Sequence, residues 1–343
     1  METINNDSSL KDGLISKDKL IALKKNLIGN ETVIVICGPT CSGKTRAALN
    51  LAMLLDTDII SADSMQAFRY MDIGTDKQDL EKFSVKQFMI NICDPDYRLT
   101  AVEFRDIARK VIKEEFFNKN KIPIIAGGSG LHIRAIIDDL MCAPDSRHEL
   151  KKEIKEKIKL KGLDYYYNEL KKMDMEYALK ISSNDERRIV RALEVCYSTN
   201  RKFSDYLTNW EERKSIYNCV MIGLNTERKS LYDNIDKRVK EMIEKGLLEE
   251  VSLLYERGYS GCNSITQAIG YKELIKYLDG EMSLDESIEE IKKNTRHLAK
   301  KQLTWFKADG RINWVESGSS AGIKDIMKDI LSIINLKVEH GRI

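Results

Sequence analysis

Short apolar runs that predict buried strands recur along the chain, and helix-like spacings of apolar residues separate them. The runs are residues 33–37, 58–62, 87–92, 122–126 and 220–224. After the first run, Ala47, Ala48, Leu51 and Leu55 have the spacing of one helix face. Repeated strand–helix–strand units predict an α/β fold, with a parallel sheet flanked by helices. The ligands of such sheets lie at the carboxyl ends of the strands.

The pattern changes beyond about Pro144. Residues 148–213 are charged and helical in spacing, with no credible strand, and we interpret them as an all-helical insertion in the α/β core. The predicted parts of the chain are an N-terminal extension, 1–31; the core, 32–145 and 217–316; the helical insertion, 146–216; and a polar, weakly helical tail, 317–343.

The first predicted strand runs into a glycine-rich loop of the pattern G-x-x-x-x-G-K-[ST], and a helix is expected to begin at Lys44. The loop consists of Gly38, Pro39, Thr40, Cys41, Ser42, Gly43, Lys44 and Thr45. Backbone N–H groups, the helix N-terminus and Lys44 together supply positive charge for an anion. Such a loop holds a di- or triphosphate, with Thr45 placed to ligate Mg²⁺. The alternative is a strand-to-helix turn that binds nothing.

Composition narrows the class of protein. With 343 residues, 32% of them charged, and only 4 prolines, we expect a soluble, helix-rich α/β protein. Because the net charge is only +2, any nucleic acid must bind to local stripes of basic residues, since the chain as a whole is not basic. The 7 cysteines include no C-x-x-C pair, which favours free thiols in a reducing compartment. Since there is neither a signal pattern nor a membrane-spanning apolar run, the expected location is the cytoplasm, with no membrane partner.

Two polar residues are expected on the same rim of the sheet as the phosphate loop. Asp63 follows the second strand, and Ser129 lies in a glycine-rich turn after the strand at 122–126. Asp63 could hold, or accept a proton from, a nucleophile whose partner is anchored by its phosphates. Equally, it could cap the next turn. Ser129 could donate a hydrogen bond to a leaving phosphate, or its turn could be only a tight connection.

A long helix, expected from Ser283 to Asp309, has one apolar and one cationic face. Ile291, Leu298 and Trp305 recur every seven residues and define the packed face. The residues on the opposite side are Lys293, Arg296, His297, Lys300 and Lys307. Few acidic residues balance them, so we interpret this face as a phosphate-binding surface, for RNA or a small ligand, rather than as merely solvated.

A second candidate for RNA binding is the helix expected to start at Ser183. Arg187 and Arg191 are predicted to point outward, together with Glu194. Because the acid shares the face with the arginines, a solvated surface and an RNA-binding surface fit this pattern equally well.

The third candidate is the segment 267–272, in which Gly270 interrupts a helical pattern. A glycine inside a helix is unfavourable by about 1 kcal/mol relative to alanine, which indicates close approach of another group. Tyr271 could stack on a base and Lys272 could meet a phosphate. The alternative is that a neighbouring helix packs against the glycine.

Together these residues and motifs resemble those of the bacterial tRNA dimethylallyltransferases. The resemblance covers about residues 32–316, in order, and rests on the joint pattern rather than on the phosphate loop alone. The matching segments are residues 38–45, 61–66, 71–75, the turn at 127–128, and residues 191–194, 267–274 and 295–306.

The resemblance implies a P-loop NTPase-like core that transfers the prenyl group of dimethylallyl diphosphate to tRNA. The acceptor would be the exocyclic amine of the adenosine 3′ of the anticodon, and diphosphate would be released. It also implies that the loop Gly38–Thr45 binds the prenyl diphosphate, with Mg²⁺ bridging through Thr45. The expected partners are therefore dimethylallyl diphosphate and the anticodon stem-loop of tRNA, and we expect the chain to act as a monomer.

Residue roles follow from the same resemblance. The implied catalytic residues are Asp63, which would contact the amine, with Ser129 and Lys44. The resemblance implies these tRNA-contacting residues: Asp63, Ser64, Met65, Gln66, Arg187, Arg188, Arg191, Gln267, Gly270, Tyr271 and Lys272. The cationic face of the helix from Ser283 adds Arg296 and Lys300. The family usually has Thr where Ser129 stands, and Tyr and Gly where Phe68 and Tyr70 stand.

Two other functions remain compatible with the phosphate loop. One is an enzyme that prenylates free adenine nucleotides, or a small-molecule P-loop kinase, neither of which needs the insertion or the basic stripes. The other is a non-catalytic RNA-binding module that uses the loop as a nucleotide switch. Such a module has no use for the Asp63 carboxylate on the same rim.

Overall fold

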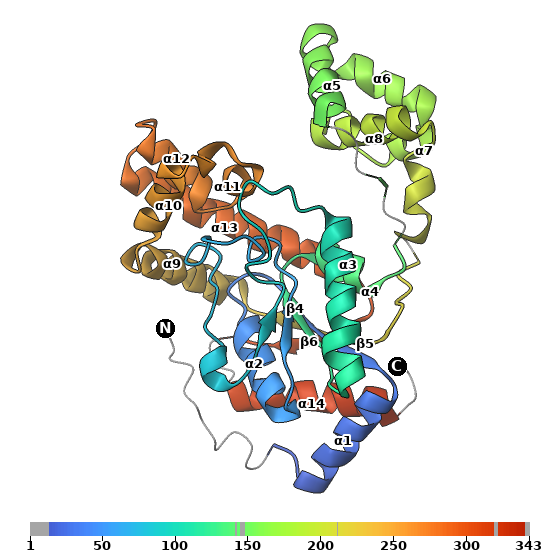
Figure 1. Cartoon of the computed structure of the whole chain (residues 1–343), viewed down its shortest axis with the longest axis vertical. Helices are drawn as coiled ribbons and strands as arrows, with labels where there is room; N and C mark the ends of the chain where they lie inside the picture. The colour runs from blue at the N-terminus through green and yellow to red at the C-terminus, as the bar shows by residue number, and fades with distance from the viewer. Residues whose placement is uncertain (1–13, 141–142, 145–147, 211, 319–321, 340–343) are drawn as a thin grey trace. The chain divides into compact units, whose positions relative to one another are not determined.

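Six parallel strands form one sheet in the computed structural model, which describes residues 14–140, 143–144, 148–210, 212–318 and 322–339 (Figure 1). The strands are β1 Thr32–Cys37, β2 Ile59–Ser61, β3 Gln87–Phe88, β4 Ile124–Gly127, β5 Asn218–Asn225 and β6 Ile312–Glu316. They lie in the order β3-β2-β4-β1-β5-β6, and every neighbouring pair is parallel. The predicted parallel sheet flanked by helices is confirmed.

The chain divides into two compact units, one formed by the chain up to Ile137 and from Tyr217 onward, the other by Asp138–Ile216. The helices of the first unit are α1 Lys17–Gly29, α2 Lys44–Leu55, α3 Ala101–Val111, α4 Gly130–Ile137, α9 Arg228–Glu244, α10 Leu247–Glu256, α11 Asn263–Gln267, α12 Tyr271–Leu278, α13 Leu284–Lys307 and α14 Ile323–Glu339. Those of the second are α5 His148–Lys161, α6 Leu163–Met173, α7 Met175–Leu179 and α8 Glu186–Thr199.

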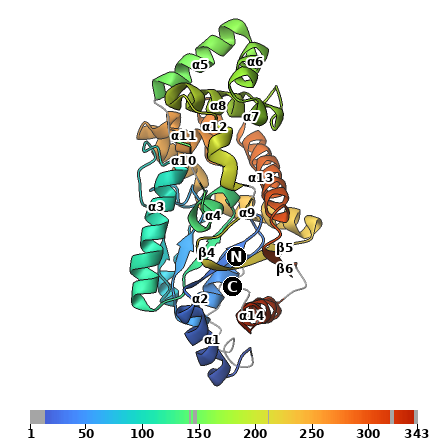
Figure 2. The same cartoon turned by 90° about the vertical axis from the view of Figure 1, so that its right-hand side faces the viewer.

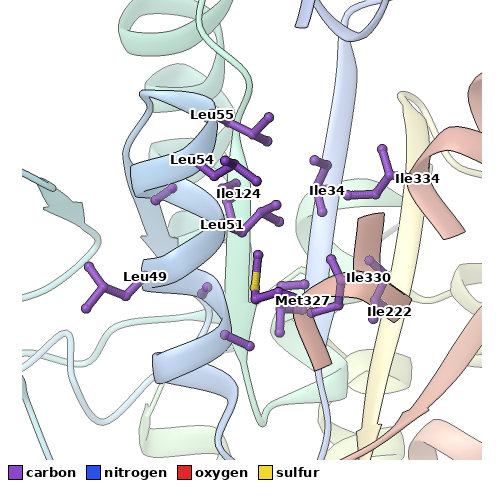
Figure 3. Packing of buried hydrophobic residues seen from close by; sticks show 14 of the residues in the cluster. Ile34, Leu49, Leu51, Leu54, Leu55, Ile124, Ile222, Met327, Ile330 and Ile334 are labelled. Carbon is purple, nitrogen blue, oxygen red and sulfur yellow. The ribbon is translucent and has the colours of Figure 1, made fainter. Parts of the chain in front are cut away.

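Helices cover both faces of the sheet, because successive side chains of a strand point to opposite sides. From β1, Ile34 and Ile36 enter a core cluster with residues of α1, α2 and α14 (Figure 3). Val33 and Val35 enter a second cluster with residues of α3, α4 and α13. A third cluster joins α9, α10, α12 and α13 to the segment that follows β2.

The second unit has its own core, in which apolar residues of α5, α6 and α8 pack together. Figure 2 shows the helices that carry them. An isolated antiparallel bridge joins Asp138 to Ser215, close to both ends of the unit. The insertion expected from the sequence, 146–216, thus lies within Asp138–Ile216, and its first two residues are outside the described part of the chain.

The expected weakly helical tail, 317–343, contains the helix α14, and the end of the predicted core forms a strand. Residues 312–316 form the edge strand β6, which pairs with β5. In α14, Met327, Ile330 and Ile334 point toward the sheet and are buried (Figure 3). Leu27 of α1 belongs to the same cluster, so the described parts of the predicted extension and tail both belong to the α/β core. Residues 1–13, 319–321 and 340–343 lie outside the described residues.

The third strand is shorter than the run 87–92 predicts, because only Gln87 and Phe88 pair with β2. Met89 and Asn91 have positive φ values of 66° and 53°, which turn the backbone out of the strand conformation. An apolar run alone cannot reveal this bend.

The capping box at Ser283 is confirmed, but the packed face of α13 differs from the predicted one. Ile291 is buried as predicted, whereas Leu298 is 38% exposed and Ala299 and Phe306 are buried instead. A strict seven-residue repeat drifts by about 20° per repeat around a straight helix, so the core-facing residues move away from that spacing.

On α8, the N-cap is Asp185 rather than Ser183, and Asp185 accepts a hydrogen bond from the backbone N–H of Arg188. Glu194, predicted to face outward with the arginines, is buried instead. Its carboxylate still lies 3.7 Å from the Arg191 guanidinium, so the acid continues to balance one of the two arginines.

We predict that Leu331→Ala in α14 lowers the free energy of unfolding by about 2–4 kcal/mol, because truncating a buried leucine loses transfer energy and leaves a cavity. Leu331 is 3% exposed, whereas Leu336 in the same helix is 53% exposed. Leu336→Ala, the matched control, should change stability by about 0.5–1 kcal/mol at most. Urea unfolding followed by circular dichroism compares the two variants, and equal losses would contradict the core role of α14.

Candidate active site

The phosphate loop, residues 38–45, leaves β1 in a conformation that its glycines permit. Gly38 has φ +141°, and a Cβ there would lie 2.7 Å from the carbonyl oxygen of Leu224. Gly43 has φ +85° and caps α2, which begins at Lys44 as predicted. Ser42 Oγ is buried and has no hydrogen-bond partner among the described residues. An unpaired buried hydroxyl beside a helix N-terminus suits a bound anion.

Lys44 donates a hydrogen bond from Nζ to the carbonyl oxygen of Pro39. Burial lowers the pKa of Lys44 to about 8; Cys41 and Asp63 raise it, and Arg238 lowers it. The ammonium is thus held in the loop at a pKa that a bound anion would raise. Thr45, the next residue, lies in the first turn of α2.

Arg238 of α9 reaches the same loop. Its guanidinium donates a hydrogen bond to Thr40 Oγ1 over 2.9 Å and lies 3.6 Å from a carboxylate oxygen of Asp76. No sequence motif points to this residue. It lies beside Val239 in an ordinary amphipathic helix, and no local pattern distinguishes it from a solvated arginine.

Gln302 of α13 also contacts the loop, and its role was missed although it lies in a segment used for the resemblance. Its side-chain oxygen accepts a hydrogen bond from the backbone N–H of Thr40 over 2.8 Å. A Cβ at Gly128 would lie 2.5 Å from the Gln302 side-chain nitrogen, so the glycine turn after β4 makes room for this glutamine.

Asp63 follows β2 and is half-buried. One carboxylate oxygen accepts a hydrogen bond from the backbone N–H of Met65 over 3.0 Å, so the acid does cap its own turn, as the alternative interpretation expected. Its charge also acts on Lys44, Arg238 and His132. Capping occupies one oxygen, and the carboxylate still lies within electrostatic reach of the phosphate loop.

Ser129 lies just before α4, and its Oγ is 2.6 Å from Nδ1 of His132. Burial lowers the pKa of His132, while the Asp63 carboxylate raises it. The imidazole ring also packs edge-on against Phe104, with ring centroids 4.7 Å apart. Ser129 is therefore oriented by His132, to which no sequence motif points.

The segment after Asp63 is tied to the C-terminal helices through Glu250 of α10. The Glu250 carboxylate accepts hydrogen bonds from the backbone N–H groups of Asp72, Ile73 and Gly74, over 2.9, 2.8 and 3.2 Å. It also accepts one from the hydroxyl of Tyr271, over 2.6 Å. Four donors on one carboxylate hold residues 72–74 against α10 and α12.

This arrangement corrects two expectations for the segment 267–272. Tyr271 is 0% exposed, so its predicted stacking on a base is wrong; its ring packs against Gly74, where a Cβ would lie 2.4 Å away. Gly270 lies between α11 and α12, not inside a helix, and is required by its φ of +96°. Gln267 is exposed and Lys272 partly exposed, beside Glu273.

Other predicted RNA contacts are engaged within the fold. Gln66 bridges Ser61 Oγ and the carbonyl oxygen of Thr75, over 2.7 and 3.0 Å, which closes the segment after β2. Ser64 and Met65, beside it, are half-buried.

Arg296 bonds both carboxylate oxygens of Asp236 at 2.5 Å, so α9 supplies the acid that α13 lacks. On the cationic face of α13, Arg296 is therefore paired within the fold, whereas Lys300 is exposed. In the second unit, Arg191 donates to the carbonyl oxygens of Ala143 and Pro144. Arg187 and Arg188 are exposed on α8.

The fold and this site define a P-loop α/β protein in which a carboxylate lies within electrostatic reach of the phosphate-loop lysine. Comparison with known proteins gives the family: a sequence model described as "IPP transferase" matches residues 66–309. The chain therefore belongs to the IPP transferase family, as the resemblance indicated.

Relatives match over almost their whole length. The chain is 40% identical to a tRNA dimethylallyltransferase of Acetivibrio thermocellus, over 88% of this chain and 96% of that protein. It is 39% identical to one of Bacillus mycoides, over 92% and 99%.

Solved structures are similar as well. A tRNA isopentenylpyrophosphate transferase from Bacillus halodurans superposes with a TM-score of 0.66 at 36% identity, over 91% of this chain and 100% of that one. A eukaryotic dimethylallyltransferase acting on tRNA gives a TM-score of 0.75 at 25% identity, over 90% and 80%.

We predict that affinity for inorganic diphosphate falls about tenfold per pH unit above pH 8, because neutral Lys44 must then take up a proton on binding. Below that pH Lys44 is already charged, and its contribution is constant. Calorimetric titrations between pH 7 and 10 measure the effect. Lys44→Arg, whose guanidinium stays charged throughout, should show no break near pH 8; a flat profile for the unmodified protein would contradict the prediction.

Proposed function

We propose that this chain transfers the dimethylallyl group of dimethylallyl diphosphate to the exocyclic amine of the adenosine 3′ of the anticodon in tRNA. The observation that carries the proposal is the strand register, which brings the Asp63 turn and the phosphate loop to one edge of the sheet. The Asp63 charge there raises the pKa of Lys44. Family membership supports it, since related proteins of nearly equal length are named tRNA dimethylallyltransferases. Because its substrate would be tRNA, we expect the protein in the cytoplasm. We also expect it to act as a monomer.

In the proposed reaction, the bond between the allylic carbon and the bridging oxygen breaks, and its electron pair leaves with the diphosphate. The amine nitrogen forms the new bond to that carbon, and Asp63 accepts the proton that the nitrogen loses. Lys44, Arg238 and the loop N–H groups stabilise the charge on the leaving group. Ser129, oriented by His132, donates a further hydrogen bond to it.

The residues present also suit Mg²⁺. This ion keeps several waters and is usually held through substrate phosphates with few protein ligands. Thr45, in the first turn of α2, belongs to the same loop as Ser42, whose buried Oγ is unpaired, and its hydroxyl fits that role. Bound there, Mg²⁺ would neutralise diphosphate charge.

The exposed residues proposed to contact tRNA are Arg187, Arg188, Gln267 and Lys300, with partly exposed Lys272 and the turn Asp63–Gln66. The adenosine must leave its stack to reach the donor, as in other enzymes that modify a base. Arg191, Arg296 and Tyr271 would act on tRNA only indirectly, through the contacts that hold them in the fold.

A labelling experiment tests the proposal. The protein is incubated with radiolabelled dimethylallyl diphosphate and Mg²⁺, with unmodified tRNA in one reaction and AMP in another. Label should enter tRNA, at a single adenosine. Label in AMP alone would replace the proposal with an adenine-nucleotide prenyltransferase.

We predict that Asp63→Asn reduces turnover about 100-fold or more while tRNA affinity changes little, because the amide cannot accept the proton but keeps the shape of the turn. Single-turnover rates and filter binding of tRNA separate the two effects. Unchanged turnover would remove Asp63 from the mechanism.

A further inference from the structure

Tyr70 has a backbone conformation that does not suit its side chain. Its φ is +65°, in the left-handed region, where non-glycine residues are disfavoured by about 1–2 kcal/mol. Burial does not compensate for this, because Tyr70 is 45% exposed. Residues held in such conformations cluster at functional sites, so this observed outlier suggests a role for the exposed ring.

The segment that carries Tyr70 begins at the carboxyl end of β2 with Asp63, the proposed catalytic residue. It is fixed on both sides of Tyr70. Before it, the backbone N–H of Arg69 donates to the carbonyl oxygen of Cys93 over 2.8 Å. After it, Glu250 accepts the N–H groups of residues 72–74. The ring therefore projects from a held backbone and loses little freedom when it binds a ligand.

Arg257, at the end of α10, lies over the ring of Tyr70, with its guanidinium 4.7 Å from the ring centroid. Arg257 is exposed, and it follows the helix that carries Glu250. One helix thus anchors the Tyr70 segment and supplies a cation to its ring. By contrast, Arg69 is paired with the carboxylate of Asp94 at 3.0 Å.

We propose that Tyr70 and Arg257 form a stacking platform for an unpaired base of the RNA substrate, distinct from the adenosine that is modified. Exposed aromatic rings and guanidinium planes are the groups on which proteins stack unpaired RNA bases, and an arginine also meets the adjoining phosphate. The proposal rests on the proposed function, because it takes the ligand to be RNA.

The test compares tRNA affinity among variants of Tyr70. Tyr70→Gly and Tyr70→Leu should weaken tRNA binding about 5- to 100-fold, the value of one lost base stack, whereas Tyr70→Phe should bind as the unmodified protein does. Tyr70→Gly should not lower Tm, because glycine adopts this φ without strain. The Kd for inorganic diphosphate checks that the phosphate loop is intact, and Tyr255→Leu, an exposed tyrosine on α10, is the matched control.

Salt dependence separates the two members of the platform. Arg257→Gln should reduce the slope of log affinity against log salt by about one, because a phosphate contact releases a counterion, whereas Tyr70→Leu should leave the slope unchanged. The platform is overturned if Tyr70→Gly or Tyr70→Leu binds tRNA as tightly as the unmodified protein, or if Tyr70→Phe loses as much as either. The labelling experiment with the unmodified protein tests the proposed function, whereas the affinities of the variants test the platform. The two failures can therefore be told apart.

Discussion

Three neighbouring strands end level with one another, and the hydrogen bonds between them fix that register. Cys37 of β1 pairs with Gly127 of β4, and Ser61 of β2 pairs with Ala126. The residues that follow each strand therefore emerge at one edge of the sheet. Gly127 is required there, because a Cβ would lie 2.7 Å from the backbone of Ala62. The phosphate loop, Asp63 and Ser129 depend on this alignment for their common position.

Positive and negative side chains lie together at that edge of the sheet. Lys44 and Arg238 lie around the phosphate loop, whereas Asp63 and Asp76 supply the acidic side chains near them. The depressed pKa of Lys44 shows that burial already disfavours its charge before an anion arrives. In the proposed reaction, the charges of Lys44 and Arg238 stabilise the leaving diphosphate electrostatically.

The C-terminal helices complete the edge. Gln302 and Arg238 contact Thr40 from α13 and α9, and Glu250 holds residues 72–74 from α10. The same helices pack in one cluster with Phe68 and Met71, which follow β2. Changes in this cluster would reach both the phosphate loop and the Asp63 segment, because hydrogen bonds and packing link them directly.

The sequence by itself determined the parallel α/β core, the phosphate loop, the helix start at Lys44 and the family, because these depend on local patterns of apolar residues and glycines. It did not reveal that residues 312–316, at the end of the predicted core, form a strand, or that α14 packs on that core. These features depend on pairing with β5 and on contact with distant residues of α1 and α2. Only the tertiary structure decided which polar residues work together. Arg238, Gln302 and Glu250 act through partners far away in the chain, whereas His132 acts through nearby Ser129. Tyr271 and Arg296 proved to be engaged internally. Spacing along a helix indicates which side chains share a face. Which other segment of the chain contacts that face is decided by tertiary packing alone.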